Sequence, residues 1–299
     1  MKINPSIRLQ VPEDFRFEPN LGYLTRSASE CLYQIRDGGI YRALPIPGTP
    51  IVMIRSAPDR DLVVKFLGAA SELADELAPA AAAYIRDWLD LDTELTPFYR
   101  LAAADPILAA AVETHRGLRL IGIPDLYEAL AWGILGQQIN LAFAYTLKRR
   151  LVETYGGRID HEGHAYWTFP RPETIAALDV RDLLPLKLTV KKCEYLIHTA
   201  RLVADGTLSK EGLASLGFRE AEQALVRIRG IGPWTANYVL MRCLRMKDAF
   251  PIDDVGLHHA LRHVTGSAAK PSREDIRRMA AGWSGWEAYA TFYLWRLLY

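Results

Sequence analysis

The spacing of apolar and polar residues changes near residue 95. Before it, short alternating runs predict strands at 7–11, 15–17 and 50–56, and a hairpin over 31–44 that turns at Asp37, Gly38 and Gly39. From Asp59 the spacing becomes helical and runs on through an alanine-rich segment, which favours helix over disorder. These patterns predict an α+β domain over residues 1–95, with a small antiparallel sheet and helices.

Beyond Pro97 the chain shows almost no alternating pattern, and we predict that residues 96–299 are all helical. Asp125, Asn140, Thr189 and Ser272 stand where N-caps are expected. Gly136, Gln137 and Gln138 interrupt the pattern between two helices, and Gly156 and Gly157 close the second of them. The predicted helices are 126–136, 141–155, 173–179, 190–204, 219–228, 233–246, 256–264, 272–282 and 286–299.

Composition narrows the class of protein. Of the 299 residues, 50% are apolar and 24% are charged, as in ordinary soluble globular proteins. The sequence shows no leader and no apolar run near the roughly 18 residues that span a bilayer, so we expect a cytoplasmic protein with no membrane partner. Cys31, Cys193 and Cys243 lie far apart, which argues against a disulfide framework, a zinc knuckle and a four-cysteine iron–sulfur cluster.

Charge is divided unevenly along the chain. Residues 1–95 contain 10 Lys and Arg against 14 Asp and Glu, and the remainder contains 26 against 21. The second part is therefore the basic one, which is compatible with a polyanionic partner.

The segment 225–242 reads as helix, Gly-Ile-Gly turn and helix. Gly230 and Gly232 allow a tight turn and a close approach of the backbone, and Pro233 suits the first position of a helix. The exposed amides of such a turn form a site for an anion, most naturally a phosphate. A helical hairpin that merely requires glycines is the alternative.

The helix after this turn carries Trp234, Tyr238 and Met241 on one face, at i, i+4 and i+7. The opposite face is apolar and supplies core contacts, which leaves the aromatic residues able to line a cavity. Asp253 and Asp254 follow just before the next helix. One of them is expected to cap that helix, which leaves the other for a different task.

Together these segments resemble the helix–hairpin–helix Gly/Pro…Asp (HhH-GPD) superfamily of DNA glycosylases, and among them the bacterial AlkA-type 3-methyladenine glycosylases. The matching segments are "NLGYLTRS", "ILGQQIN", "GIGPWTANY", "FPIDDVGL" and "WEAYATFYLWRLLY". The resemblance implies a sheet domain followed by two helical parts that enclose a cleft. These would be 125–246, and 96–124 together with 247–299.

The resemblance also implies roles for individual residues. Asp254 would be the catalytic carboxylate and Asp253 the capping neighbour. The base pocket would be lined by Trp234, Tyr238, Trp295 and Tyr23. The gap that the flipped-out base leaves in the duplex would be contacted by Gln137, Gln138 and Ile139. A phosphate of the DNA backbone would be bound by Gly230, Gly232, the amide of Trp234 and Thr235. A monovalent cation would bind the main-chain carbonyls of Val226, Ile228 and Ile231.

These roles imply a monomeric, monofunctional enzyme that flips and releases alkylated purines from damaged duplex DNA without a cofactor. Two positions depart from the family pattern: Gln138 stands where leucine is common, and Val255 replaces an aromatic residue. Lyase relatives carry a lysine at the position of Trp234, and without that amine no Schiff base can form there. A bifunctional 8-oxoguanine-type enzyme is therefore disfavoured.

A non-catalytic helix–hairpin–helix DNA-binding module is the main alternative, since it also needs the glycines. A metalloenzyme finds little support. The segment "HEGH" at 161–164 has the wrong spacing for a zinc motif, and His259 and His263 lack a third ligand nearby.

Overall fold

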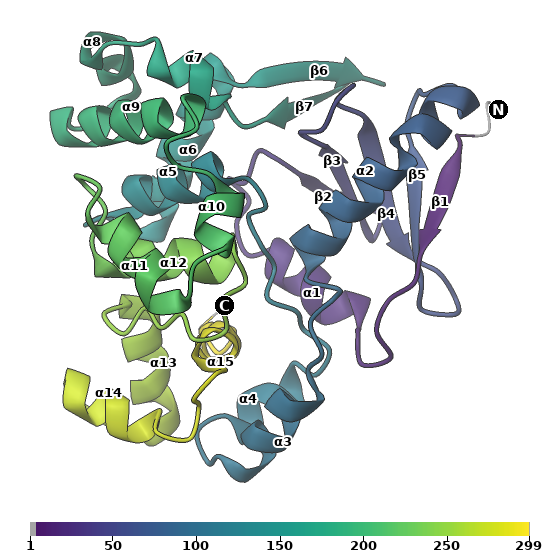
Figure 1. Ribbon diagram of the computed structural model, residues 1–299. Coiled ribbons are helices and arrows are strands. Elements are labelled where there is room, and N and C mark those ends of the chain that lie inside the picture. Colours follow the sequence, from purple (N-terminus) through teal and green to yellow (C-terminus); the bar gives the residue numbers. More distant parts are fainter. Residues whose placement is uncertain (1–3, 299) are drawn as a thin grey trace.

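The computed structural model describes residues 4–298. Its N-terminal part is built on a five-stranded antiparallel sheet of order β1-β5-β4-β3-β2 (Figure 1). The strands are β1 (Ser6–Leu9), β2 (Gln34–Arg36), β3 (Gly39–Ala43), β4 (Ile51–Ser56) and β5 (Leu62–Phe66). The small antiparallel sheet predicted for this part of the chain is confirmed.

The hairpin predicted over 31–44 is also confirmed. Arg36 pairs with Gly39, so the turn consists of Asp37 and Gly38, whose φ angles are 48° and 69°. Two consecutive positive φ angles are typical of a type I′ turn, which matches the twist of the strands it joins. The Asp-Gly pair thus sets the register of β2 on β3.

Two local predictions in this part are wrong. The segment predicted to turn helical from Asp59 contains β5, in which Leu62, Val64 and Phe66 are buried and Lys65 is exposed. This period of two marks a strand, and the helical pattern that follows hid it. The strand predicted at 15–17 is the entry to helix α1 (Phe17–Leu24), whose first residue is buried beside Phe15.

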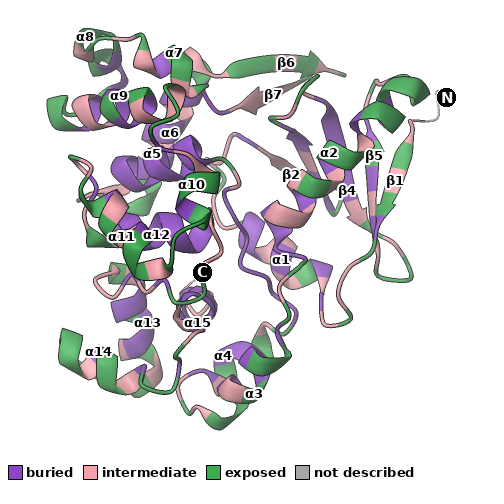
Figure 2. Ribbon diagram, in the orientation of Figure 1, coloured by how far each residue is buried: buried purple, intermediate pink, exposed green. Residues whose placement is uncertain are grey.

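Helix α2 (Ser71–Leu89) lies across the sheet (Figure 1) and presents to it one buried stripe, seen in Figure 2. The buried residues of α2 are Ala74, Leu77, Ala81, Ile85, Trp88 and Leu89, which recur at helical spacing. The solvent side of the same helix exposes polar residues such as Glu72 and Glu76 together with Leu73. The sheet and α2 thus form the two layers of the N-terminal part.

The rest of the chain is mainly helical. The helices are α3 (Thr96–Ala104), α4 (Ala109–Thr114), α5 (Leu126–Gly136), α6 (Leu141–Tyr155), α7 (Pro172–Ala176), α8 (Val180–Leu183), η1 (Leu184–Leu186), α9 (Val190–Ala204), α10 (Lys210–Ala214), α11 (Phe218–Val226), α12 (Pro233–Arg242), α13 (Val255–Thr265), α14 (Arg273–Met279) and α15 (Glu287–Trp295). At the centre lies α5, which packs against α6, α9 and α12 and is buried from Leu126 to Leu135 (Figure 2). A helix that is apolar on all sides belongs in a core.

One more prediction is wrong: residues 96–299 are not all helical. Strands β6 (Gly157–His161) and β7 (His164–Thr168) form a second hairpin beside the first sheet (Figure 1). Tyr166 of β7 is buried against Ala43 and Ile51, and the Gln34 side chain donates to the Ala165 carbonyl across 2.8 Å. The strands are short, and Tyr166 is the one buried residue in them, so they carry no strong apolar pattern, yet they tie the helical part to the sheet.

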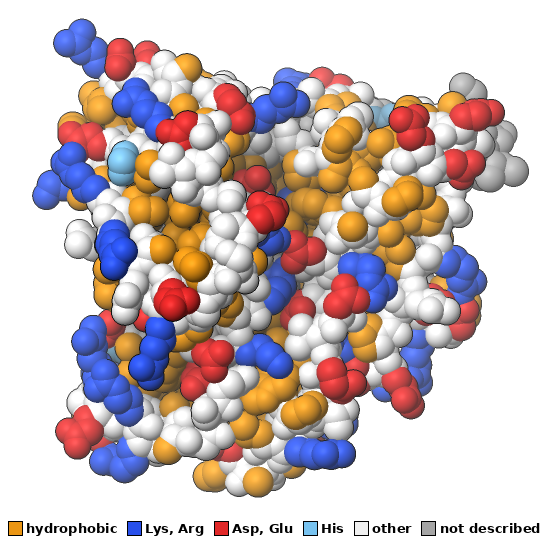
Figure 3. All heavy atoms as spheres, viewed as in Figure 1, with side chains coloured by type: hydrophobic (Ala, Val, Ile, Leu, Met, Phe, Trp, Pro, Cys, Tyr) orange, Lys and Arg blue, Asp and Glu red, His pale blue; other side chains and the backbone are white. Residues whose placement is uncertain are grey.

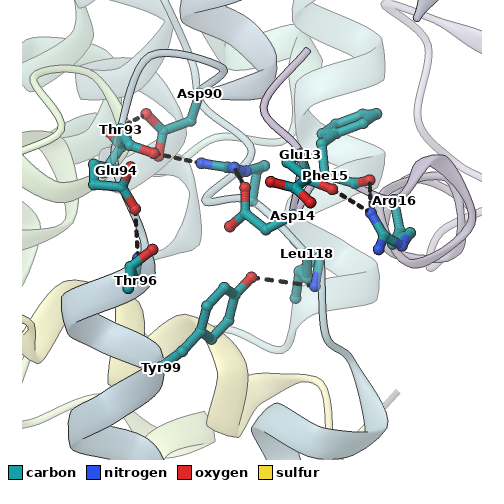
Figure 4. Close-up of polar contacts among 12 residues, drawn as sticks. Glu13, Asp14, Phe15, Arg16, Asp90, Thr93, Glu94, Thr96, Tyr99 and Leu118 are labelled. Atoms are coloured by element: carbon teal, nitrogen blue, oxygen red, sulfur yellow. Dashed lines mark hydrogen bonds and ion pairs between the residues drawn. The ribbon is translucent and has the colours of Figure 1, made fainter. Parts of the chain in front are cut away.

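The chain leaves the N-terminal part near residue 95. A network of polar contacts joins the two parts there (Figure 4). The fully buried guanidinium of Arg119 donates to the Asp14 carboxylate and to the Thr93 carbonyl. The hydroxyl of Thr93 donates to Asp90 across 2.6 Å, and the Tyr99 hydroxyl accepts from the Gly117 amide across 3.2 Å. These contacts hold the first helices of the second part against the N-terminal part.

Over residues 4–298, no helix combines the length and the apolar character that crossing a membrane requires.

Candidate active site

The connection between α5 and α6 forms one edge of the candidate site. Asp125 caps α5 through the amide of Glu128, and Asn140 caps α6 through the amide of Phe143, so both predicted caps are present. Between these helices Gln138 has φ 59° and is exposed. The left-handed region costs a non-glycine residue about 1–2 kcal/mol. The structure therefore maintains a strained polar residue at the tip of this loop.

The glycine turn between α11 and α12 forms the second edge. Gly230 has φ 96°, and a Cβ atom there would lie 2.3 Å from Cγ of Tyr195, so both backbone and space require glycine. Gly232 takes the N-cap position of α12 and Pro233 follows it. Gly230 therefore has the positive φ expected of this turn, whereas Gly232, with φ −91° and open space for a Cβ atom, does not require glycine.

Gln137 joins these two edges. Its side-chain amide donates to the Gly230 carbonyl across 2.9 Å and to the Thr235 hydroxyl across 3.2 Å. Thr235 is 2% exposed. Both side chains are therefore engaged inside the protein, and of the loop residues predicted to meet DNA only Gln138 is fully exposed.

Asp254 receives three N–H groups. The indole of Trp234 donates to Oδ2 across 2.9 Å, and the indole of Trp295 donates to Oδ1 across 2.8 Å. The amide of Leu257 also donates to Oδ1, across 2.8 Å, which makes Asp254 the N-cap of α13. Three donors fix the position and the orientation of this carboxylate.

The assignment of the cap to Asp253 is therefore wrong. Asp253 instead forms an ion pair with Arg273, and the hydrogen bond from that guanidinium lowers the pKa of the Asp253 carboxyl. Asp254 both caps α13 and lines the cleft, and Asp253 also reaches the cleft wall. Adjacent residues of the same type cannot be told apart by sequence pattern when either can cap a helix.

Four aromatic side chains line the space beside Asp254. Trp234 and Tyr238 stack with ring centroids 5.5 Å apart and 27° between their planes, and Tyr238 lies 6.3 Å from Trp295. Tyr23 from α1 packs against Phe292 with a centroid distance of 4.5 Å. Burial raises the pKa of the Tyr238 hydroxyl, which keeps it neutral.

These residues share one open cleft of about 590 Å³. Its walls include the catalytic and pocket residues and the loop residues predicted from the sequence: Asp254, Trp234, Tyr238, Trp295, Tyr23, Gln137, Gln138 and Ile139. Among the predicted residues that do not line it are Gly230, Gly232, Thr235, Val226, Ile228 and Ile231, which belong to α11, the turn and the start of α12.

Sequence reasoning missed several residues on the walls of this cleft, among them Arg26, Trp132, Arg242 and Gly256. On α12, Arg242 comes eight residues after Trp234 and four residues after Tyr238, a spacing that places it on the same face as these two. That spacing is a signal the sequence offers. The positions of Arg26 and Trp132 depend on how the N-terminal part packs on α5, which no local pattern encodes.

The basic and acidic side chains are divided over the surface, as they are divided between the two parts of the chain. Lys and Arg side chains lie along the edge formed by α9, α11 and α14, whereas acidic side chains gather near α2 (Figure 3). The residues past 95 therefore carry a basic edge on the helical side of the molecule.

The chain matches known families over most of its length. The sequence profile of the HhH-GPD superfamily base excision DNA repair proteins matches residues 131–285, and that of the AlkA N-terminal domain matches residues 6–125. A DNA-3-methyladenine glycosylase of Bacillus subtilis is 48% identical over 100% of this chain and 99% of its own. DNA-3-methyladenine glycosylase 2 of Escherichia coli is 35% identical over 66% of this chain and 62% of its own.

A solved structure has the same fold. The 3-methyladenine DNA glycosylase of Archaeoglobus fulgidus superimposes with a TM-score of 0.82 at 24% identity, over 98% of this chain and 97% of that one. With the Asp254 cleft, the glycine turn and these matches, the chain belongs to the HhH-GPD superfamily of base excision DNA repair proteins and carries the AlkA-type N-terminal domain.

Proposed function

We propose that this protein is a monofunctional DNA glycosylase that hydrolyses the N-glycosidic bond of alkylated purines, of the 3-methyladenine and 7-methylguanine type, in duplex DNA. The observation that carries the proposal is the Asp254 carboxylate, held by two indole N–H groups at the wall of an aromatic cleft. A DNA-binding module without catalysis has no use for a carboxylate placed there.

The glycosidic bond is inaccessible inside a duplex, so the nucleotide has to leave the base stack at a cost of a few kcal/mol. The strained, exposed Gln138 and the half-buried Ile139 beside it stand at the mouth of the cleft. We propose that Gln138 fills the space vacated by the flipped base. Its side chain has no hydrogen-bond partner among residues 4–298, unlike that of Gln137.

The flipped base would stack on Trp234 and Tyr238, whose rings are already parallel to within 27°. Purines methylated at N3 or N7 carry a positive charge, and cation–π attraction contributes on the order of 0.5–2 kcal/mol per ring. Val255 is 62% exposed beside this mouth, and the side chain there is smaller than an aromatic ring. The entrance is accordingly wide.

Cleavage needs stabilisation of positive charge on the sugar. As the C1′–N bond breaks, the bonding electrons leave with the base and an oxocarbenium ion develops, which a fixed carboxylate stabilises electrostatically. Asp254 is held in one orientation before the reaction, so little reorganisation is needed. The same carboxylate is placed to accept a proton from the water that attacks C1′.

The amides of Gly230, Gly232 and Trp234 would bind a phosphate of the strand, together with the positive end of α12. The family also holds a monovalent cation on hairpin carbonyls, here those of Val226, Ile228 and Ile231. The geometry is compatible with such an ion: the Ile228 oxygen accepts one bond, from the Ile231 amide across 3.0 Å, and retains a second lone pair.

The test is release of methylated purines from alkylated duplex DNA by the wild type and by Asp254→Asn. Asparagine keeps the shape and one acceptor oxygen but removes the charge. We expect release to fall by at least 100-fold with DNA affinity retained, and no strand nicking by either protein because Trp234 offers no amine. Equal turnover by both proteins would overturn the assignment of Asp254.

A further inference from the structure

Arg42 of β3 is a buried cation with an incomplete set of partners. It is 4% exposed, and its guanidinium lies 4.5 Å from the centre of the Trp88 ring and 5.2 Å from that of the Tyr84 ring. Its Nε has no hydrogen-bond partner among residues 4–298, and the paired oxygen of Glu128 is 3.8 Å from the guanidinium, beyond hydrogen-bond range. A buried polar group in this state normally bonds to an ordered water or an ion.

Arg42 lines a small cavity where the N-terminal part meets the helical part. Within residues 4–298, the cavity wall carries four cations and two carboxylates: Arg26, Arg42, Lys148 and Arg242, with Glu30 and Glu128. Tyrosines do not correct this imbalance, because burial raises the pKa of Tyr33 and of Tyr145 and keeps their hydroxyls neutral. The wall therefore has an excess of two positive charges, which is costly in a buried place.

The two carboxylates are already engaged. Lys148 donates to both oxygens of Glu30, across 3.1 and 3.2 Å, and to Oε1 of Glu128 across 3.4 Å. The amides of Cys31 and Leu32 also donate to Oε1 of Glu30, across 2.8 and 2.9 Å. Glu30 is thus compensated by Lys148 and by the backbone, and it offers little to the arginines.

Arg26 and Arg242 donate to neutral oxygens. Arg242 is 3% exposed, and it donates from Nε to the Ile121 carbonyl across 2.7 Å and from Nη1 to the Tyr238 hydroxyl across 2.9 Å. Arg26 donates to the Tyr23 carbonyl across 3.1 Å. Neither arginine has a carboxylate partner among residues 4–298. Their charges are left to be balanced from the cavity or from the cleft, since both residues line both spaces.

The size of the cavity limits its occupant. Its volume is about 30 Å³, and one water molecule needs roughly 10–15 Å³ of such space. Two waters or one monatomic anion therefore fit, whereas a phosphate or a nucleotide does not. Water would satisfy the donors and leave the excess charge in place. A small anion does both.

We propose that this cavity binds one chloride ion, with Arg42 as its main donor. A hydrogen bond from a cation to an anion is roughly twice as strong as one between neutral groups, which offsets the dehydration of the ion. Arg42 belongs to the sheet, whereas Lys148 and Arg242 belong to α6 and α12, so the ion joins the two parts of the chain. Binding requires neither DNA nor catalysis, and the site is therefore independent of the proposed glycosylase function.

The dependence of stability on chloride tests this site. Urea unfolding of the wild type is measured at rising chloride concentration, while sodium gluconate, whose anion is too large for the cavity, keeps the ionic strength constant. A ligand that binds one site of the folded state raises the folding equilibrium constant in proportion to its concentration once that concentration exceeds Kd. In this range we expect about a tenfold rise in the folding equilibrium constant for each tenfold rise in chloride, and the same with bromide.

Variants of Arg42 assign the effect to the cavity. Arg42→Met should abolish the chloride dependence, and Arg42→Lys, which keeps the charge with fewer donors, should weaken it. Arg55→Met is the matched control: Arg55 lies on the neighbouring strand β4, and its Nε also has no hydrogen-bond partner among residues 4–298, but it does not line the cavity. This control should keep the full dependence. Equal dependence in the wild type and in Arg42→Met would overturn the proposal, because the ion would then bind elsewhere.

Crystals of the wild type grown in bromide locate the ion directly. We expect an anomalous scattering peak in the cavity, within hydrogen-bond distance of the Arg42 guanidinium. Ordered water in the cavity without an anomalous peak would overturn the proposal, since water alone would then satisfy the donors. If Arg42→Met does not fold, the bromide peak and the unfolding of Arg42→Lys decide.

Discussion

The indole of Trp295 donates its N–H to Oδ1 of Asp254 across 2.8 Å, although the two residues are 41 positions apart. Trp295 therefore holds the carboxylate as well as lining the pocket. Trp295→Phe keeps an aromatic ring, removes the donor and makes the side chain smaller, so it needs a control for packing. A hydrogen bond to a charged group contributes about 1.5–3 kcal/mol, so we expect kcat for methylated-purine release to fall about 10- to 100-fold, with a smaller change in DNA affinity.

Trp283→Phe is the matched control for this prediction. The indole of Trp283 donates to Asp105 across 2.8 Å, the same bond at a site away from the cleft. This variant should lose stability but keep kcat. If both tryptophan variants reduce kcat alike, the loss comes from packing and not from the orientation of Asp254.

Gly256 leaves the space that Trp295 and Asp254 occupy. A Cβ atom at this position would lie 2.9 Å from Oδ1 of Asp254 and 3.2 Å from Nε1 of Trp295. Gly256→Ala should therefore displace the indole or the carboxylate and lower kcat at least tenfold, measured as base release under saturating enzyme. Gly282→Ala, where the nearest atom would be 3.9 Å away, should be nearly neutral. Full activity of Gly256→Ala would show that Asp254 tolerates movement.

The sequence predicted the fold class and many helix ends from local signals, whereas Tyr23, Trp295 and the role of Asp254 were implied by the resemblance to the family. Asp125 and Asn140 cap the helices on either side of the exposed Gln138, and glycines form the turn before Trp234. Such signals depend on neighbours within four residues. They therefore survive without knowledge of the tertiary structure.

The failures share one cause, which is that tertiary packing decides the outcome. Strand β5 is stabilised by pairing with β1 and β4, and the β6–β7 hairpin is held by the packing of Tyr166 on Ala43 and Ile51. Which of Asp253 and Asp254 caps α13 depends on where Arg273 and Trp295 lie. The burial of Arg242 likewise follows from the packing of α12 against Ile121, which no periodicity encodes.

Gln138 should show opposite effects on stability and on activity. Its φ of 59° costs about 1 kcal/mol that glycine does not incur, so Gln138→Gly should be more stable to urea by up to that amount. The same variant loses the side chain proposed to fill the gap in the duplex, and release from duplex DNA should fall, while release from single-stranded DNA should change less. If release from duplex and from single-stranded DNA falls equally, the gap-filling role belongs to Ile139. The variant Ile139→Ala then tests that role.

Lys148 should control how stability depends on pH. It lies 3.1 Å from Glu30 and 3.4 Å from Glu128, and all three side chains are about 7% exposed or less. Burial alone raises the pKa of Glu30, but the charge of Lys148 overcomes it and holds that pKa below the ordinary value of 4.5. In the wild type this pair therefore stabilises the fold at neutral pH, and its contribution is lost as the pH falls below about 4.5.

Lys148→Met removes the cation and leaves two carboxylates buried, a change that costs about 3–5 kcal/mol at pH 7 to 8. Without Lys148, burial raises the pKa of Glu30 against only the backbone N–H groups of Cys31 and Leu32, so the carboxyl takes up a proton as the pH falls and the variant recovers stability. Urea unfolding at pH 8, 6 and 5 should show the gap to the wild type narrowing steadily. Arg158→Met, which breaks an exposed ion pair with Asp160, should cost little at any of these pH values. If the difference in unfolding free energy between Lys148→Met and the wild type stays constant with pH, the packing of the lysine stem, and not its charge, stabilises this part of the fold.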